Sequence, residues 1–162
     1  KGQSALFEIR SIADEINARQ HQHRCEVLTL ERTRANAQQA LVLNVKEGTS
    51  IFHSVMVHYE NDLPVQIEDR CVNAEIVPEY LAQDYSQTTP HAYLSLIAPL
   101  TEGEHIVEAV RASAEECALL NIKEHDPCLL IRRKTWSASS IVSHARLLFP
   151  GSRYRLQGRF MS

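Results

Sequence analysis

"FHSVMVHYENDLPVQIEDR", residues 52–70, has the pattern of two β-strands joined by a tight polar turn. Side chains along a strand point alternately to opposite faces, so odd and even residues separate into two sets. The odd set is an apolar face suited to a core and consists of Val55, Val57, Tyr59, Val65, Ile67 and Cys71. The even set is polar and carries Ser54, His58, Glu60, Gln66, Glu68 and Arg70, with Phe52 and Met56 among them.

The even-numbered face has two interpretations. One face of an antiparallel sheet is commonly solvated, and these side chains would then lie on the surface. Phe52 and Met56 are too apolar for plain water, however, and a concave surface that is half apolar and half ionic is typical of a small-molecule site. His58, Glu68 and Arg70 would give such a site a titratable group, an acceptor and a donor. Both interpretations stay open at this stage.

A weak internal repeat predicts how the rest of the chain is arranged. "AQQALVLNVKEGTSIFHSVMVHY", residues 37–59, aligns without gaps with "AEECALLNIKEHDPCLLIRRKTW", residues 114–136. Each copy reads as a helix, a turn and a strand, and two such units are expected to share one sheet because neither buries its apolar face alone. The repeat transfers the even face onto Leu129, Ile131, Arg133 and Thr135, with Ser143 on the returning strand. Two mixed faces of this kind can close one cleft.

The remaining segments alternate between helix and strand. Apolar spacings of three and four residues predict a first helix from Leu6 to about Arg19. "SAEECALLNI" predicts a helix that begins with a capping box, formed by Ser113 and Glu116. "CLLIRRKTW" and "SIVSHARLLF" predict a second hairpin, and "YRLQGRF" predicts a closing strand.

The composition excludes several classes of protein. The 162 residues suit one domain, and a net charge of −3 argues against a chain that grips a phosphate backbone by itself. No run of 18 apolar residues is present, so neither a membrane span nor a membrane partner is expected. Four cysteines without a CxxC pair favour reduced thiols in a cytoplasmic protein.

No motif requires an enzyme or a cofactor. The sequence has no Walker loop, no dinucleotide fingerprint and no G-x-S-x-G elbow. Glu102, Glu104 and His105 could serve as acid–base groups, but a solvated turn explains them equally well. "HQHRC" places His21, His23 and Cys25 at alternating positions, as three metal ligands could be, yet no fourth ligand is evident. We therefore expect no metal site, and whether these three residues bind metal stays open.

Four stretches together resemble a known family over essentially the whole chain: "LFEIRSIADEI", the N-D-x-P turn of "ENDLPVQIEDRCVN" with Glu68 beyond it, "AYL", and "SHARLLFPGSRYRLQGRF" with its G-x-R-Y turn. They are similar to the UTRA ligand-sensing domain of GntR-type bacterial repressors, in the subgroup that regulates histidine utilisation. The resemblance implies an α+β fold like chorismate lyase, a largely antiparallel mixed sheet flanked by helices. Residues 1–162 would form one effector-binding and dimerisation domain. The winged helix-turn-helix that precedes it in the family is expected to be absent here, so operator DNA would be contacted only through that missing domain.

The resemblance also implies a set of ligand-binding residues. They are Ser11, Met56, His58, Glu68, Arg70, His91, Tyr93, Ser143 and Phe149. Two arginines that hold phosphate in relatives fall on Met56 and His58, which favours an effector smaller and less charged than a phosphosugar. For this subgroup the implied effector is urocanate or a related imidazole metabolite, with no cofactor.

The function implied is that of a sensor. Urocanate would shift the homodimer of a repressor of histidine catabolism genes and release its DNA-binding heads from the operator. The alternative is a chorismate-lyase-like enzyme acting on an aromatic carboxylic acid. That chemistry needs cations for two carboxylates, and Met56 at a usual arginine position speaks against it. A plain dimerisation domain with a vestigial cleft is a third interpretation.

Overall fold

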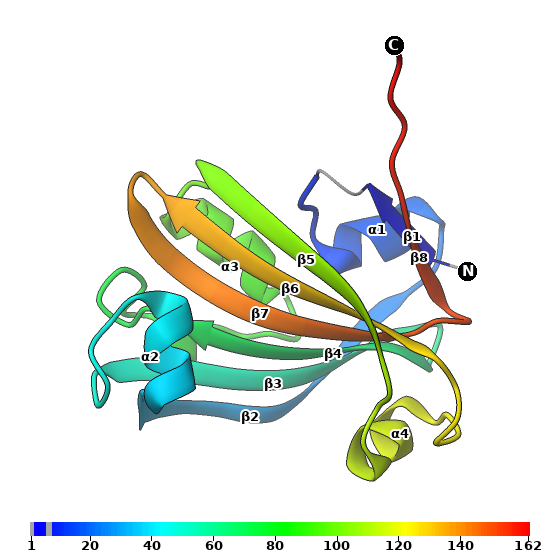
Figure 1. Cartoon of the computed structure of the whole chain (residues 1–162), viewed down its shortest axis with the longest axis horizontal. Coiled ribbons are helices and arrows are strands. Elements are labelled where there is room, and N and C mark those ends of the chain that lie inside the picture. Colours follow the sequence, from blue (N-terminus) through cyan, green and yellow to red (C-terminus); the bar gives the residue numbers. More distant parts are fainter. Residues whose placement is uncertain (1, 6–7) are drawn as a thin grey trace.

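A computed structural model describes residues 2–5 and 8–162 and has a six-stranded antiparallel sheet at its centre (Figure 1). From edge to edge, the sheet contains β2 (His23–Arg34), β3 (Ser50–Glu60), β4 (Leu63–Val72), β7 (Ser140–Pro150), β6 (Cys128–Ser137) and β5 (Glu102–Val110). β1 (Gly2–Ala5) and β8 (Tyr154–Gln157) form a separate parallel pair. The helices are α1 (Ile12–Ala18), α2 (Ala37–Leu43), α3 (Pro90–Ile97) and α4 (Ala114–Leu120), with a short 3₁₀ helix η1 (Tyr80–Ala82). The predicted α+β class is confirmed.

The internal repeat is visible in the sheet itself. β2, β3 and β4 form one half, β5, β6 and β7 form the other, and the halves join where β4 pairs with β7. α2 and α4 precede the equivalent strands β3 and β6, and both helices begin with a capping box. Both helices end at an asparagine in the left-handed conformation, Asn44 and Asn121, as expected for a residue that tolerates positive φ. The two units therefore share one sheet, as the repeat predicts.

The two faces of the sheet are covered by different helices (Figure 1). α2 and α4 cover the odd-numbered face, where Val57 and Ile67 pack with Leu120. α3 covers part of the even-numbered face, where Phe52 and Met56 pack with Leu94 in one apolar cluster. Because both faces are covered, the interpretation of a solvated polar face is wrong. We call the even-numbered side, which carries Glu68 and its neighbours, the pocket face.

Two motifs of the sequence have structural reasons. Asn61 and Asp62 form the turn between β3 and β4 with φ of 48° and 64°, as a two-residue type I′ hairpin turn requires. Arg153, in the turn before β8, donates to the carbonyl oxygens of Pro64, Leu120 and Asn121. A Cβ atom on Gly151 would lie 2.9 Å from the Pro127 carbonyl oxygen, so the close approach there requires glycine.

The first helix is shorter than the apolar spacing predicts. α1 begins at Ile12 with Ser11 as its N-cap, and Ile9 lies before the helix. Leu6, the predicted start, lies outside the described residues. The Ser11 hydroxyl makes no capping bond because it hydrogen-bonds to the Thr89 hydroxyl at 3.0 Å. In the part of the chain that the structure describes, no helix combines the length and the apolar character needed to cross a membrane.

Candidate functional site

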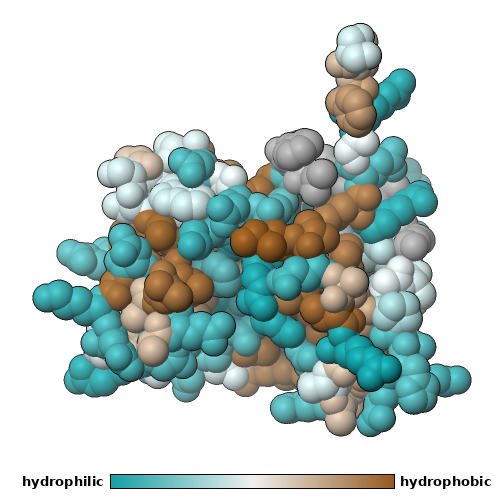
Figure 2. All heavy atoms as spheres, in the orientation of Figure 1, coloured by the Kyte–Doolittle hydropathy of each residue, from teal (hydrophilic) through white to brown (hydrophobic). Residues whose placement is uncertain are grey.

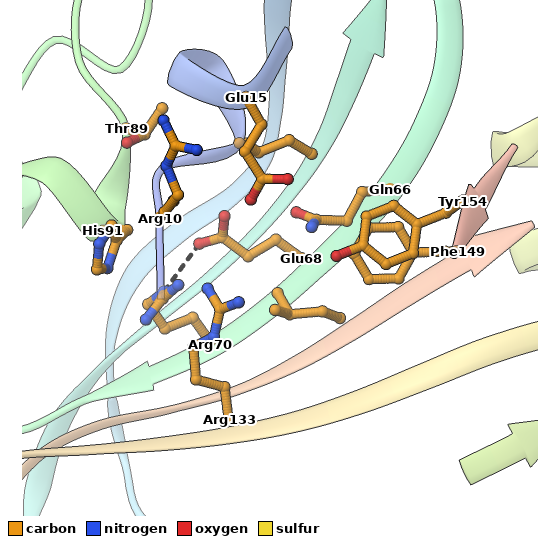
Figure 3. Close-up of a pocket in the computed structure, with 12 residues that line it drawn as sticks. Arg10, Glu15, Gln66, Glu68, Arg70, Thr89, His91, Arg133, Phe149 and Tyr154 are labelled. Atoms are coloured by element: carbon orange, nitrogen blue, oxygen red, sulfur yellow. Dashed lines mark hydrogen bonds and ion pairs between the residues drawn. The ribbon is translucent and has the colours of Figure 1, made fainter. Parts of the chain in front are cut away.

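A small cavity lies on the pocket face, under the start of α1 (Figure 3). Its volume is about 20 Å³. Residues from α1 and the segment before it, from β4, β6, β7 and β8, and from the start of α3 line it: Arg10, Ile12, Glu15, Gln66, Glu68, Arg70, Thr89, His91, Arg133, Leu147, Phe149 and Tyr154. We call it the central cavity. Both halves of the sheet contribute to it.

A row of buried hydrogen bonds crosses the floor of the central cavity. Glu68 Oε1 lies 2.8 Å from His58 Nε2, and Glu68 Oε2 accepts a hydrogen bond from Arg70 Nε at 2.8 Å. Arg70 Nη1 then donates to Ser143 Oγ at 2.9 Å. At the outer end, His58 Nδ1 lies 2.9 Å from His23 Nε2. The Glu68–Arg70 bond lies within β4, and the other three connect neighbouring strands, so the row is held in place by the sheet.

The charge of Glu68 is stabilised by its neighbours. Burial alone would raise the pKa of this carboxyl, but the Arg70 guanidinium and the hydrogen bond with His58 outweigh that effect, so the pKa is lowered. The pKa of Arg70 is in turn raised, since the attraction of Glu68 exceeds the effect of burial. Glu68 and Arg70 are therefore a buried ion pair in which both groups are charged at neutral pH.

A second buried guanidinium, that of Arg133, faces the same cavity from β6 (Figure 3). Its Nε donates to His105 Nε2 at 2.9 Å, and no ion pair joins it to a carboxylate of the described residues. Burial, and then repulsion by Arg70, lowers its pKa to about 10. Glu68 is the one buried carboxylate among the described residues, against two buried arginines. The floor of the cavity therefore has an excess of positive charge.

His91 adds a neutral polar group at the side of the cavity. It follows Pro90 in the first turn of α3, whose N-cap Thr89 accepts a hydrogen bond from Ala92 N at 3.2 Å. Burial, and then the charges of Arg70 and Arg133, lowers the pKa of His91 to about 4. At neutral pH this imidazole is therefore uncharged and can donate from one nitrogen and accept at the other.

An aromatic pair closes the opposite side of the cavity. The rings of Phe149 and Tyr154 stack with their centroids 3.6 Å apart and an interplanar angle of 12°. Both residues are largely buried. Figure 3 shows the two rings stacked on one another next to Gln66, with the Tyr154 hydroxyl directed towards the cavity. This wall offers a flat surface for a planar molecule.

The residues expected at the site fall into three groups. Glu68, Arg70, His91 and Phe149 line the central cavity. Ser11, His58 and Ser143 lie directly behind it, bonded to Thr89, Glu68 and Arg70 respectively. Met56 is fully buried in the apolar cluster under α3, and Tyr93 packs against that cluster. The structure therefore brings seven of the nine together around one cavity.

Sequence reasoning missed several residues of the lining: Arg10, Ile12, Glu15, Gln66, Thr89, Arg133, Leu147 and Tyr154. A signal existed for three of them, because Gln66 and Arg133 lie on the predicted mixed faces and Tyr154 belongs to the closing G-x-R-Y motif. Arg10 and Glu15 gave no signal, since only the tertiary position of α1 brings them over the sheet.

The histidines and the cysteine that the sequence offered as metal ligands have other surroundings in the structure. His21 contacts Glu60, His23 contacts His58, and residues 2–5 and 8–162 contain no group of three His, Cys, Asp or Glu side chains arranged to hold a metal ion. Burial raises the pKa of Cys25 to about 12, which disfavours a thiolate ligand at neutral pH. His105 serves as an acceptor for Arg133.

Comparison with known proteins points to one family. The sequence-family model of the UTRA domain matches residues 18–155 of the chain. The histidine utilization repressor of Klebsiella aerogenes is 79% identical over 162 residues, which cover 100% of this chain and 67% of that protein. The solved C-terminal domain of the histidine utilization repressor from Pseudomonas syringae pv. tomato str. DC3000 is 57% identical, with a TM-score of 0.83, and the match covers 87% of this chain and 100% of that one.

A more distant structure agrees in fold. The effector domain of PhnF from Mycobacterium smegmatis has a TM-score of 0.90 at 17% identity, with 99% of each chain covered. That likeness concerns the fold alone. The chain spans about two thirds of the length of the curated histidine utilization repressors that it matches.

Proposed function

Since the chain belongs to the UTRA domain family, we propose that it is the effector-sensing and dimerisation domain of a transcriptional repressor of histidine catabolism genes. The named relatives are transcriptional repressors, so the chain is a regulatory domain and not an enzyme. The chorismate-lyase-like activity considered from the sequence is therefore set aside. In the proposed repressor, a DNA-binding domain outside residues 1–162 contacts the operator.

The effector that we propose is urocanate or a closely related imidazole acid. The observation that carries this proposal is the pair of buried guanidiniums, Arg70 and Arg133, on one cavity with a single buried carboxylate among the described residues. A buried cation without a counter-ion is unfavourable, and an entering carboxylate would both neutralise it and accept its N–H groups. The Phe149–Tyr154 wall then provides a surface for the conjugated ring.

The empty cavity is too small for this effector. About 20 Å³ is room for roughly one water molecule. A second cavity of about 10 Å³ lies on the other side of Arg70 and His91, and movement of these side chains would join the two. The start of α1 covers the central cavity from above, so binding requires a shift of side chains or of this cover. A ligand changes the equilibrium between two such arrangements only through its different affinity for each.

A second copy of the chain is the partner that we propose for this domain. β5 is an edge strand, and its residues Ile106 and Val107 are 48% and 39% exposed. Figure 2 shows apolar surface along this strand. An edge strand with exposed apolar side chains is a usual site of association. Effector binding in both copies would alter the spacing of the two DNA-binding domains.

Calorimetry on the domain tests the proposal. Urocanate and histidine are titrated into wild type, Arg133→Gln and Arg132→Gln. Arg132 is the matched control because it points to the opposite face of β6 and pairs with Glu108 at 2.8 Å. We expect urocanate to bind wild type and Arg132→Gln alike and to bind Arg133→Gln at least tenfold more weakly. Absence of heat with both compounds on folded wild-type protein would remove the effector proposal.

A further inference from the structure

The two ends of the central cavity differ in charge. Figure 3 shows the guanidinium groups of Arg10, Arg70 and Arg133 on one side. Towards the other side, the Glu15 carboxylate extends down from α1 above Glu68 and beside Gln66, and the aromatic wall lies beyond Gln66. The cavity therefore suits a dipolar molecule with an anionic group at one end and a hydrogen-bond donor at the other.

The two carboxylates of the cavity are held differently. Glu68 lies in the sheet with one oxygen on His58 and the other on Arg70. Glu15 is half-buried in the first turn of α1, so its position depends on the element that covers the cavity. Glu15 acts electrostatically on Arg133 at the floor of the cavity. It raises the pKa of Arg133, although the larger effect of burial lowers that pKa. Glu15 is thus a carboxylate of the cover that lies between the arginines and Gln66.

We infer that Glu15 determines specificity by accepting a hydrogen bond from a ring N–H of the effector. The inference rests on the proposed function, because it takes the effector to be a planar acid whose carboxylate meets the arginines. That orientation places the ring against Tyr154 and Phe149, on the side of the cavity where Gln66 and Glu15 lie. An ionised carboxylate only accepts hydrogen bonds, so a ring oxygen at the same position would face it without a donor. The site would select planar acids with an N–H heterocycle.

A simpler role for Glu15 makes the opposite prediction. If Glu15 only neutralised the arginines, its removal would increase the positive potential and strengthen the binding of every acid. If Glu15 instead accepts a hydrogen bond from the ring, its removal weakens the binding of only those acids that carry the N–H. The comparison of two acids of the same shape therefore separates the roles.

The experiment uses trans-urocanate and 3-(2-furyl)acrylate, in which the ring has an oxygen and no N–H. Both acids are titrated by calorimetry into wild type, Glu15→Gln and Asp14→Asn. Asp14 is the matched control, because it is the neighbouring acid in the first turn of α1 and is exposed outside the cavity lining. Loss of an acid from the first turn weakens the helix similarly in both variants. Thermal unfolding of each variant establishes that it is folded.

The expected result is a loss of selectivity. Wild type should bind urocanate roughly ten- to a hundredfold more tightly than furylacrylate, as for a charge-assisted hydrogen bond. Glu15→Gln should remove most of that ratio by weakening the binding of urocanate alone, and Asp14→Asn should preserve the ratio. The inference would be overturned if Glu15→Gln changed the affinity for both acids equally or changed neither. Urocanate binding by wild type would in that case still support the proposed function. If wild type bound neither acid, the proposed function itself would fail.

Discussion

Replacement of Arg133 by glutamine is expected to move stability and effector affinity in opposite directions. Burial and the charge of Arg70 lower the pKa of this guanidinium from 12.5 to about 10. At about 1.4 kcal/mol for each pKa unit, the buried charge then costs the fold roughly 3 kcal/mol at neutral pH. Because the folded-state pKa of this base is the lower one, the cost is present below pH 10 and disappears as the pH rises towards 12.5. Removal of the charge should therefore raise the free energy of unfolding, by up to that amount.

The effect on the effector has the other sign. A charge-assisted hydrogen bond between a guanidinium and a carboxylate contributes about 1.5–3 kcal/mol, which corresponds to a roughly 10- to 150-fold change in Kd. Arg133→Gln retains one donor and loses the charge, so a large part of this affinity should be lost. A binding residue that is unfavourable for the empty fold is typical of functional sites.

Urea denaturation and calorimetry on the same preparations check both halves. The control Arg132→Gln removes an exposed pair with Glu108, and such pairs contribute about 0–1 kcal/mol. Its stability and its urocanate affinity should both stay close to those of wild type. The reasoning is refuted if Arg133→Gln is less stable than wild type by more than about 1 kcal/mol and binds urocanate normally, because the hydrogen bond to His105 would then be its main role.

Three further outcomes are expected. Glu68→Gln leaves the buried Arg70 without its counter-ion and should lower the free energy of unfolding by about 3–5 kcal/mol in urea. In wild type the stability from Glu68 is present above about pH 4.5 and is lost as the pH falls, since its folded-state pKa is lowered. His91 is neutral in the fold down to about pH 4, so the unfolding temperature should fall as the pH drops from 6.5 to 4, and less steeply in His91→Gln. Ile106→Lys on β5 should convert the proposed dimer to monomer in light scattering, whereas Leu41→Lys, equally a lysine at an exposed apolar position, should not. A constant unfolding temperature of wild type between pH 6.5 and 4 would contradict the His91 prediction. An unchanged mass of Ile106→Lys would contradict the dimer prediction.

The sequence predicted most of what local rules decide. Alternation separated Val57 from His58 correctly, and the strand register confirms that His58, Glu68 and Arg70 share one face. The repeat predicted that Arg133 and Thr135 lie on that face too, and the pairing of β6 with β7 confirms it. These results follow because a strand has a period of two residues whatever surrounds it. The capping box of Ser113 and Glu116 is equally local and is present.

What the sequence could not predict depends on distant contacts. The length of α1 is one case, since Ser11 bonds to Thr89, 78 residues away, and the helix begins only after it. Arg10 and Glu15 belong to the cavity because α1 lies across the pocket face, which no periodicity reveals. Met56 shows the reverse problem. It has the parity of the pocket face but lies where α3 covers that face, so it packs in the core.

The repeat also explains how one ligand could act on the whole domain. Arg70 comes from the first half of the sheet and Arg133 from the second, and Arg133 occupies the position that Met56 holds in the first copy. The two buried cations therefore meet at one cavity only because the halves pair through β4 and β7. A carboxylate between them would relieve a repulsion that spans both halves, and a volume of about 20 Å³ leaves no room for the ring unless the surroundings of the cavity move. The sheet on one side is fixed by its hydrogen bonds, so the segment from Arg10 to Glu15 is the element expected to shift.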